Sequence, residues 1–225
     1  MRAAEPDGVV YAAGGGGDEL NVAYNMDCME YMKTLPDKAF ELCICDPPYG
    51  IGNFVQTSGN VRGKAVKWND HTPTSDYFAE LRRVSKDQII WGANYYNSFS
   101  KNGGAIVWYK HTPPETNLSE CEIASYSRLK RVAFVDLIWQ NVNRCEETIH
   151  PCQKPVALYE WLLTHYAKHG DRILDTHLGS GSSRIAAYNL GFDFVGCEID
   201  KDYFDAQEKR FAAHTAQTSL FDGEG

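Results

Sequence analysis

Residues 172–197 constrain the fold of this chain more than any other part of the sequence. A short apolar strand at 172–174 leads into a turn that contains Gly179 and Gly181, and a helix at 182–190 is followed by a strand at 194–197. Elsewhere, apolar stretches and helical patterns alternate in the same way. The expected strands cover 20–24, 40–45, 88–91, 105–109 and 132–139, and the expected helices cover 26–35, 77–84, 155–169 and 203–214. This alternation predicts an α/β fold, with a mostly parallel sheet and helices on both faces.

The 225 residues suffice for one domain with a buried core, and 43% hydrophobic with 23% charged residues excludes a disordered chain. We expect a loosely held tail at 1–17, a single domain at 18–215 and an exposed tail at 216–225. No apolar run is long enough for a membrane span or a signal peptide, so we expect a cytoplasmic protein. The seven cysteines include no C-x-x-C pair, which favours reduced thiols and no metal site.

The glycine turn has the layout of a nucleoside-binding site. Glycine lets the backbone approach a ligand closely, and the helix beginning at Ser182 offers free backbone N–H groups. Glu198 ends the next strand, where a carboxylate can bind ribose hydroxyls. A dinucleotide fingerprint would need a third glycine where this chain has Arg184, which disfavours a nicotinamide-dependent oxidoreductase. Asp175, before the turn, would repel a pyrophosphate but suits the amino group of S-adenosylmethionine, which has no phosphate.

The tetrapeptide Asp46-Pro47-Pro48-Tyr49 directly follows the apolar stretch 40–45. Two prolines remove two backbone donors and fix two φ angles, so the strand must end there and the loop is stiff. Ligands of open α/β sheets bind at this carboxyl edge. The aspartate and the carbonyl of Pro47 can accept the N–H hydrogens of an exocyclic amine, and they can stabilise the positive charge that a transferred methyl group creates. Tyr49 can stack on a base swung out of a helix. The alternative is a purely structural loop.

These two motifs, in this order, resemble those of the DNA amino-methyltransferases, which modify adenine N6 or cytosine N4. In that family the Asp-Pro-Pro-Tyr loop is catalytic, and the glycine loop, here with Ser180 and Ser182, binds S-adenosylmethionine. The catalytic motif comes first, which resembles the permuted β class and small phage or bacterial adenine-specific DNA methylases. The resemblance covers residues 20–214 and implies the Rossmann-like fold of S-adenosylmethionine-dependent methyltransferases.

Two further segments match the same family. The run His150-Pro151-Cys152-Gln153-Lys154-Pro155 resembles the segment that closes over the methionine end of the cofactor, which implies cofactor contacts by His150, Gln153 and Lys154. Asp27 matches the position that contacts the adenine of the cofactor. One departure lies in the glycine loop, where the family usually has Asp-Pro-Phe and this chain has Asp175-Thr176-His177.

Basic residues in the middle of the chain are candidates for DNA contacts, although the net charge of the whole chain is −8. The stretch 50–70 follows the catalytic loop and combines aromatic with basic side chains, a pattern typical of a phosphate-contacting loop. Its candidates are Arg62, Lys64, Lys67 and Trp68. The alternative is a solvated surface loop. The clusters Arg82, Arg83, Lys86 and Arg128, Lys130, Arg131 fit a solvated face equally well.

Two features bear on specificity and partners. Only about 40 residues separate positions 110 and 150, too few for a separate recognition domain, so we expect a short or relaxed target. Near the C-terminus, Gln217, Leu220 and Phe221 resemble the pentapeptide by which bacterial replication and repair proteins bind the sliding clamp. The alternative is that the two apolar residues pack on the domain. A homodimer, which would add DNA contact area, is a further hypothesis.

The resemblance implies methyl transfer from S-adenosylmethionine to adenine N6 in DNA. Aspartate at position 46 favours adenine, because the cytosine-N4 enzymes of the family more often have serine there. Cytosine N4, RNA as the substrate, and a non-catalytic cofactor-binding or DNA-binding module are the alternatives that the residues leave open.

Overall fold

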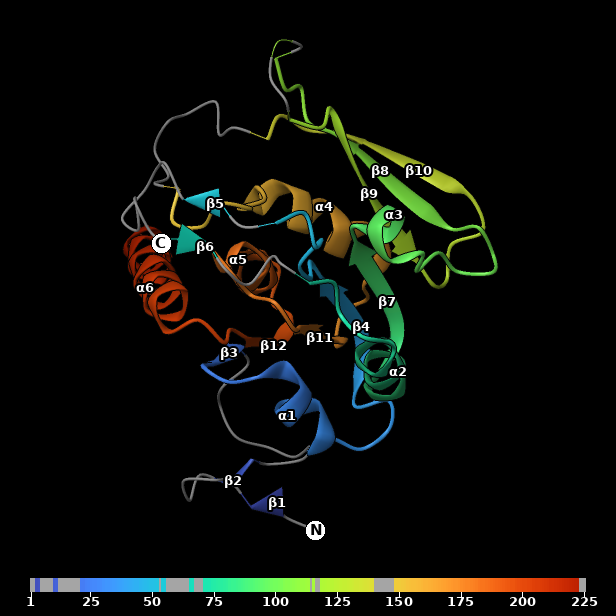
Figure 1. Ribbon diagram of the computed structural model, residues 1–225. Coiled ribbons are helices and arrows are strands. Elements are labelled where there is room, and N and C mark those ends of the chain that lie inside the picture. Colours follow the sequence, from blue (N-terminus) through green and yellow to red (C-terminus); the bar gives the residue numbers. More distant parts are fainter. Residues whose placement is uncertain are drawn as a thin grey trace.

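The core of the computed structural model is one eight-stranded sheet (Figure 1). Its strands, in spatial order, are β10 (Val132–Asp136), β8 (Ala105–Tyr109), β9 (Cys121–Tyr126), β7 (Ser85–Trp91), β4 (Phe40–Cys45), β11 (Arg172–Asp175), β12 (Asp193–Cys197) and β3 (Asn21–Tyr24). In this sheet β9 alone is antiparallel to its neighbours β7 and β8, and the other pairs are parallel. The mostly parallel α/β sheet predicted from the sequence is therefore confirmed.

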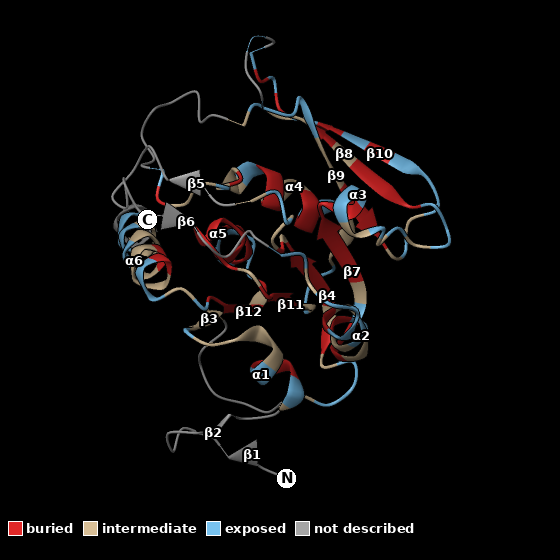
Figure 2. Ribbon diagram, in the orientation of Figure 1, coloured by how far each residue is buried: buried red, intermediate tan, exposed pale blue. Residues whose placement is uncertain are grey.

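Helices cover both faces of the sheet (Figure 1). They are α1 (Cys28–Lys33), α2 (Ser75–Val84), α3 (Ala93–Tyr96), α4 (Val156–Tyr166), α5 (Ser182–Asn189) and α6 (Lys201–Asp222). Alternate residues of a strand point to opposite faces, and β4 shows this directly. Leu42 and Ile44 belong to the apolar cluster with α4 and α5, whereas Cys43 and Cys45 belong to the cluster with α1 and α2. Figure 2 shows the central strands buried between these layers.

The structure describes residues 21–52, 71–113, 115, 118–139 and 148–217, and elsewhere only the backbone of 218–222 and of four short strands. These strands form two antiparallel pairs, β1 (Ala3–Ala4) with β2 (Val10–Tyr11) and β5 (Phe54–Val55) with β6 (Ala65–Val66). Most of the predicted tail 1–17 therefore lies outside the described residues. So do the candidate DNA contacts Arg62, Lys64, Lys67 and Trp68, and the side chains of Leu220 and Phe221.

Besides the four short strands, the main differences from the sequence-based expectation concern β9, α3 and α6. The strand β9 and the short helix α3 were not predicted, and α6 continues to Asp222 instead of ending near residue 214. The predicted tail 216–225 thus begins inside a helix, and Gln217 is an exposed helical residue. None of the described helices is long and apolar enough to cross a membrane.

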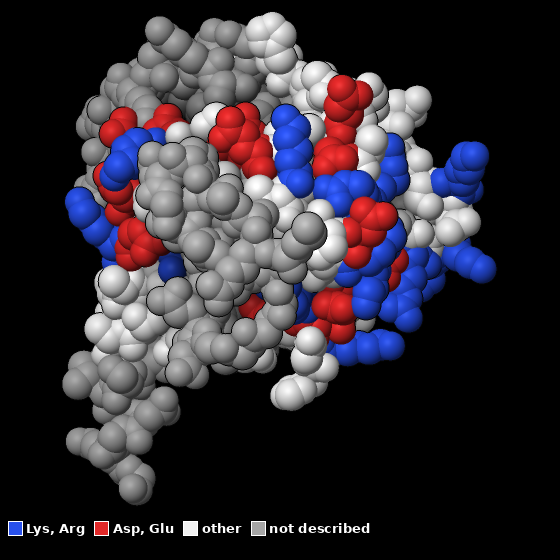
Figure 3. All heavy atoms as spheres, turned by 90° about the horizontal axis from the view of Figure 1, so that it is seen from below, with Lys and Arg blue, Asp and Glu red and all other residues white. Residues whose placement is uncertain are grey.

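Basic and acidic side chains lie next to one another on the face seen in Figure 3. Arg83 pairs with Glu80 at 2.8 Å and with Asp37 at 3.1 Å, and Lys86 pairs with Glu41 at 2.7 Å. These basic residues lie where α2 ends and β7 begins, at the amino end of the parallel strands. The ion pairs favour the solvated-face interpretation for this cluster.

Candidate active site

A cavity of about 510 Å³ opens where the carboxyl ends of β4, β8, β11 and β12 meet the amino end of β9. Its volume is in the range of small-molecule sites. Most of the predicted site residues line it: Asp46, Pro47, Pro48, Tyr49, His150, Gln153, Lys154, Gly179, Ser180, Ser182 and Glu198. Three chain segments far apart in sequence are therefore brought together at one edge of the sheet.

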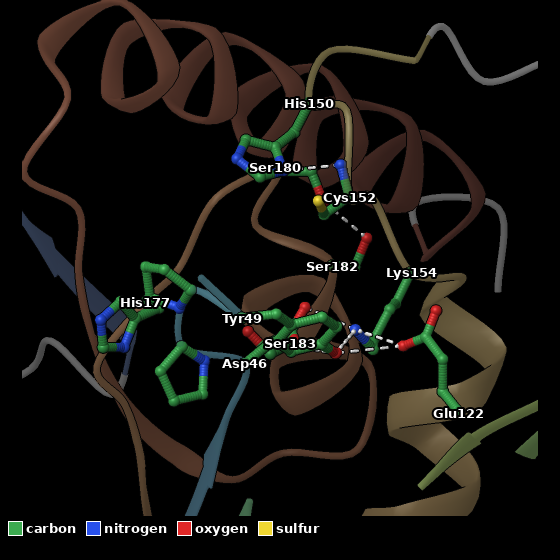
Figure 4. Close-up of polar contacts among 12 residues, drawn as sticks. Asp46, Tyr49, Glu122, His150, Cys152, Lys154, His177, Ser180, Ser182 and Ser183 are labelled. Carbon is green, nitrogen blue, oxygen red and sulfur yellow. Dashed lines mark hydrogen bonds and ion pairs between the residues drawn. The ribbon is translucent and has the colours of Figure 1, made fainter. Parts of the chain in front are cut away.

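Asp46 lies at the centre of a network of polar contacts (Figure 4). The Tyr49 hydroxyl donates to Asp46 Oδ1 at 2.6 Å, and the Lys154 ammonium donates to Asp46 Oδ2 at 2.5 Å. Burial raises the pKa of the Asp46 carboxyl, and the negative charge of Glu122 adds to this while Lys154 opposes it. The stiff Asp-Pro-Pro-Tyr loop thus holds an acid and an aromatic ring at the edge of the cavity.

The turn after β7 supports this loop, because β4 and β7 are neighbours and end together. The Tyr96 hydroxyl donates to the carbonyl oxygens of Pro47 and Pro48, and the ring of Tyr95 stacks on Tyr49 with centroids 4.7 Å apart. At Gly92, which has φ of 74°, an added Cβ would lie 2.4 Å from the Tyr49 ring. Only glycine therefore fits there, both for its backbone conformation and for the close approach of Tyr49.

Two charged residues of the cavity were missed by the sequence analysis. Glu122, at the start of β9, pairs with Lys154 at 2.9 Å and with Lys110 at 2.8 Å. Lys110 directly follows the predicted strand 105–109, so its position at the strand end was a usable signal. Glu122 gave no such signal, because its strand was not predicted.

Glu198 and Ile199 form the other end of the cavity. Glu198 accepts the backbone N–H of Gly179 at 2.8 Å and that of Asp200 at 2.8 Å, so the carboxylate and the glycine turn hold each other in place. Burial raises the pKa of Glu198 to about 7. Ile199 is 66% exposed on the cavity wall. An acceptor beside an uncovered apolar side chain fits the ribose and adenine of S-adenosylmethionine.

Three predicted cofactor residues, Asp27, Asp175 and Gly181, do not line the cavity. Asp175 is buried behind the turn, where it accepts the Ser183 hydroxyl at 2.5 Å and the backbone N–H of His177 at 3.0 Å. Asp27 caps α1 by accepting the backbone N–H of Met29 at 2.7 Å.

Two further residues of the turn, Gly181 and His177, have different surroundings. Gly181 has φ of 74°, and an added Cβ would lie 3.1 Å from Gln207 of α6. His177, by contrast, does line the cavity. Burial lowers the pKa of His177 to about 4, so its ring is neutral at physiological pH.

The segment before α4 closes the cavity from the side of the glycine turn. The His150 ring lies against Gly179, and the Gln153 side chain accepts the backbone N–H of Ile149 at 3.0 Å. Lys154, which was predicted to contact the cofactor, lines the cavity and donates to Asp46 (Figure 4). Within the described part of the chain, no group of three or more His, Cys, Asp or Glu side chains is placed to hold a metal ion.

Comparisons with known proteins point to one enzyme family. A DNA methylase family model matches residues 84–209. The type II methyltransferase M2.MboI of Moraxella bovis is 26% identical, over 84% of this chain and 86% of that protein. The type II methyltransferase M.HinfI of Haemophilus influenzae is 25% identical, over 86% of this chain and 68% of that protein.

Solved structures show the same fold. The structure of M1.HpyAVI with S-adenosylmethionine has a TM-score of 0.57 and 22% identity, over 84% of this chain and 98% of that one. The PvuII DNA methyltransferase, described as cytosine-N4-specific, has a TM-score of 0.59 and 13% identity, over 84% of this chain and 85% of that one. Because the family model spans more than half of the chain, we conclude that the protein belongs to the N6/N4 DNA methylase family and is an S-adenosylmethionine-dependent DNA methyltransferase.

Proposed function

We propose that the protein methylates the N6 amino group of adenine in DNA, at a short or relaxed target. The observation that carries this proposal is the position of Asp46, at the edge of a cavity that continues to Glu198. An acid there can meet an amino group, while an adenosine moiety lies between Glu198 and Ile199. The choice of adenine over cytosine rests on the resemblance of the Asp-Pro-Pro-Tyr loop to adenine-specific enzymes.

In this proposal the loop activates the amino nitrogen. The lone pair of an exocyclic amine is delocalised into the base, so the nitrogen is a weak nucleophile until its hydrogens are bound by acceptors. Asp46 accepts one N–H, and the Pro47 carbonyl accepts the other with the lone pair that Tyr96 leaves free. Both oxygens also stabilise the positive charge that forms on the nitrogen. S-adenosylmethionine supplies an activated methyl group on its sulfonium, so the protein mainly positions the reactants.

The cofactor site follows from the other half of the cavity. We assign ribose recognition to Glu198 and the closing of the methionine end to His150 and Gln153. The glycine turn presents the backbone N–H groups at the start of α5, and Ser180 and Ser182 line the cavity there. Asp27 and Asp175 act through the elements they hold, because Asp27 caps α1 and Asp175 braces the turn.

The DNA side of the proposal combines an aromatic wall with basic residues. Tyr49 and Tyr95 both line the cavity, where a base swung out of the duplex can stack. We propose phosphate contacts in the segment after the catalytic motif, by Arg62, Lys64, Lys67 and Trp68. The short target follows from residues 110–150, because β9 and β10 take up part of this stretch. We also propose that the protein forms a homodimer and that it binds the sliding clamp through Gln217, Leu220 and Phe221.

The test is methyl transfer from labelled S-adenosylmethionine to unmethylated DNA, followed by digestion and mass spectrometry of the nucleosides. N6-methyladenine that is absent with the Asp46→Ala variant supports the proposal. N4-methylcytosine would keep the mechanism and overturn the choice of base. An absence of any product, from protein that still gains thermal stability with S-adenosylmethionine but not with NAD, would overturn DNA methylation as its activity and direct attention to RNA.

A further inference from the structure

Four charged side chains of alternating sign cross the floor of the cavity. Lys110, Glu122, Lys154 and Asp46 come from four separate segments, and consecutive members are joined at 2.8, 2.9 and 2.5 Å. Their side chains are only 4–19% exposed. Burying charges costs free energy unless they are paired, so apolar side chains would fill this space at a lower cost, and the row calls for a functional explanation. Only Asp46 has a part in the transfer step described above.

The contacts of Asp46 raise a difficulty for that step. Both of its oxygens already accept protein donors, Tyr49 on Oδ1 and Lys154 on Oδ2. The ammonium of Lys154 competes with the incoming amine for the carboxylate. It also places a positive charge close to the nitrogen that becomes positive during transfer. A second acceptor for Lys154 would remove both obstacles.

Glu122 is placed to be that acceptor. Its Oε2 lies 2.9 Å from the Lys154 ammonium, and its Oε1 accepts Lys110 at 2.8 Å (Figure 4 shows Glu122 beside Lys154). We propose that Glu122 is a positioning residue, which holds Lys154 when the target amine takes its place on Asp46 Oδ2. Lys110 in turn orients Glu122. In this exchange the hydrogen bond from Lys154 to Asp46 Oδ2 breaks and one from the target amine forms, and no proton is transferred between groups.

The charges of the row support this role. With Glu122 ionised, two cations and two anions balance, whereas without it the row has one excess positive charge beside the reacting nitrogen. Burial opposes ionisation of Glu122, but Lys154 and Lys110 hold its pKa at about 2. Burial likewise opposes the charge on Lys154, but Asp46 and Glu122 raise its pKa. Glu122 and Lys154 therefore both keep their charges near neutral pH.

The test is a double-mutant cycle with Glu122→Gln and Lys110→Met, measured as kcat and as KM for S-adenosylmethionine. The glutamine side chain would keep the size and an acceptor oxygen but lose the charge, so kcat should fall by about tenfold or more while KM changes little. Lys110→Met should lower kcat less. It should cause no further loss in the Glu122→Gln background, because Lys110 acts only through Glu122. Glu120→Gln is the matched control, an exposed glutamate two residues away with the wild-type kcat expected.

The pH profile separates positioning from general damage. Asp46 is faced by Lys154, Tyr49 and Glu122, and Tyr96 reaches the same loop. Removing the negative charge of Glu122 lowers the pKa of Asp46, so the acid limb of the kcat profile should move to lower pH. If Glu122→Gln alone does not fold, the double variant removes the excess charge of the row and so tests the same point. It should still show the loss of kcat, because Lys154, the cation beside the reacting nitrogen, still lacks the carboxylate that holds it.

A kcat within twofold of wild type for Glu122→Gln would overturn the inference. So would a loss of kcat that is matched by weaker S-adenosylmethionine binding and lower thermal stability with no shift of the acid limb. Additive effects of the two substitutions would overturn the role of Lys110. The inference rests on the proposed transfer to an amine. The double-mutant cycle compares each variant with the wild-type protein, so it tests Glu122 separately from the identity of the base. A wild type that makes N4-methylcytosine refutes only the proposed base, whereas an active wild type with an unchanged variant refutes only the role of Glu122.

Discussion

Binding of S-adenosylmethionine should strengthen as the pH rises from 6 to 8, and Glu198→Gln should remove the part of this dependence that comes from Glu198. Burial raises the pKa of Glu198 to about 7, although the backbone N–H groups of Asp200 and Gly179 donate to it. Ribose hydroxyls donate best to the ionised form. With that pKa, about one tenth of the molecules are ionised at pH 6 and about nine tenths at pH 8, so the apparent Kd should fall by about tenfold.

Isothermal titration calorimetry at both pH values measures this ratio directly. The cofactor's own amino group and Asp175, whose pKa burial raises to about 6, also titrate in this range, but both are present in the variant. The comparison of wild type with Glu198→Gln therefore isolates Glu198. If the ratio of the Kd values at pH 6 and pH 8 is the same for both proteins, ribose recognition by the ionised carboxylate is refuted.

The same carboxyl group should change the stability of the protein without cofactor. Its pKa is higher in the folded chain than its ordinary value of 4.5, so the folded state binds a proton more tightly than the unfolded state. The resulting stabilisation is complete below about pH 4.5 and is lost as the pH rises through about 7, by roughly 3 kcal/mol in total. The Tm of wild type should therefore fall relative to that of Glu198→Gln between pH 6 and 8, which thermal melts can check.

Three further substitutions have clear expected outcomes. Tyr96→Phe should lower kcat by about fivefold in steady-state assays, the equivalent of one hydrogen bond to Pro47, with unchanged cofactor binding. The double change Leu220→Ala and Phe221→Ala should abolish binding to a sliding clamp in surface plasmon resonance while leaving methylation of short oligonucleotides intact, and loss of both activities would favour packing on the domain. The triple change of Arg62, Lys64 and Lys67 to alanine should weaken DNA binding. It should also reduce the slope of log K against log salt concentration by about 3, as measured by fluorescence anisotropy.

Much of the sheet could be predicted from the sequence because most of its strands are buried apolar runs with sharp ends. The stretches 40–45 and 105–109 match β4 and β8 residue for residue, since prolines follow the first and glycines precede the second. Helix ends were less certain. The last helix was expected to stop near residue 214, yet α6 continues to Asp222, because no glycine or proline interrupts residues 201–222.

The position of some site residues could also be predicted from the strands. Asp46 and Glu198, which each follow a buried strand, line the cavity as expected, because parallel strands bring their carboxyl ends to one edge. Asp175 also follows this rule, but its oxygens are turned inward to Ser183 and the backbone of His177. A strand-end position predicts the edge of the sheet and not the direction in which a side chain points. The difference between lining the cavity and bracing the turn is therefore visible only in the structure.

Glu122 shows the opposite limit. A single antiparallel strand reverses the rule, because its amino end lies beside the carboxyl ends of its neighbours, and the first residues of β9 therefore reach the active-site edge. The segment Cys121–Tyr126 has no clear alternation of polar and apolar residues that would predict such a strand. Once β9 is placed, however, register alone puts Glu122 opposite Trp108 of β8, two residues before Lys110, and so beside the carboxyl end of that strand. Lys110 and Glu122 are then neighbours by topology, and the buried row that ends on Asp46 follows from the insertion of one reversed strand into a parallel sheet.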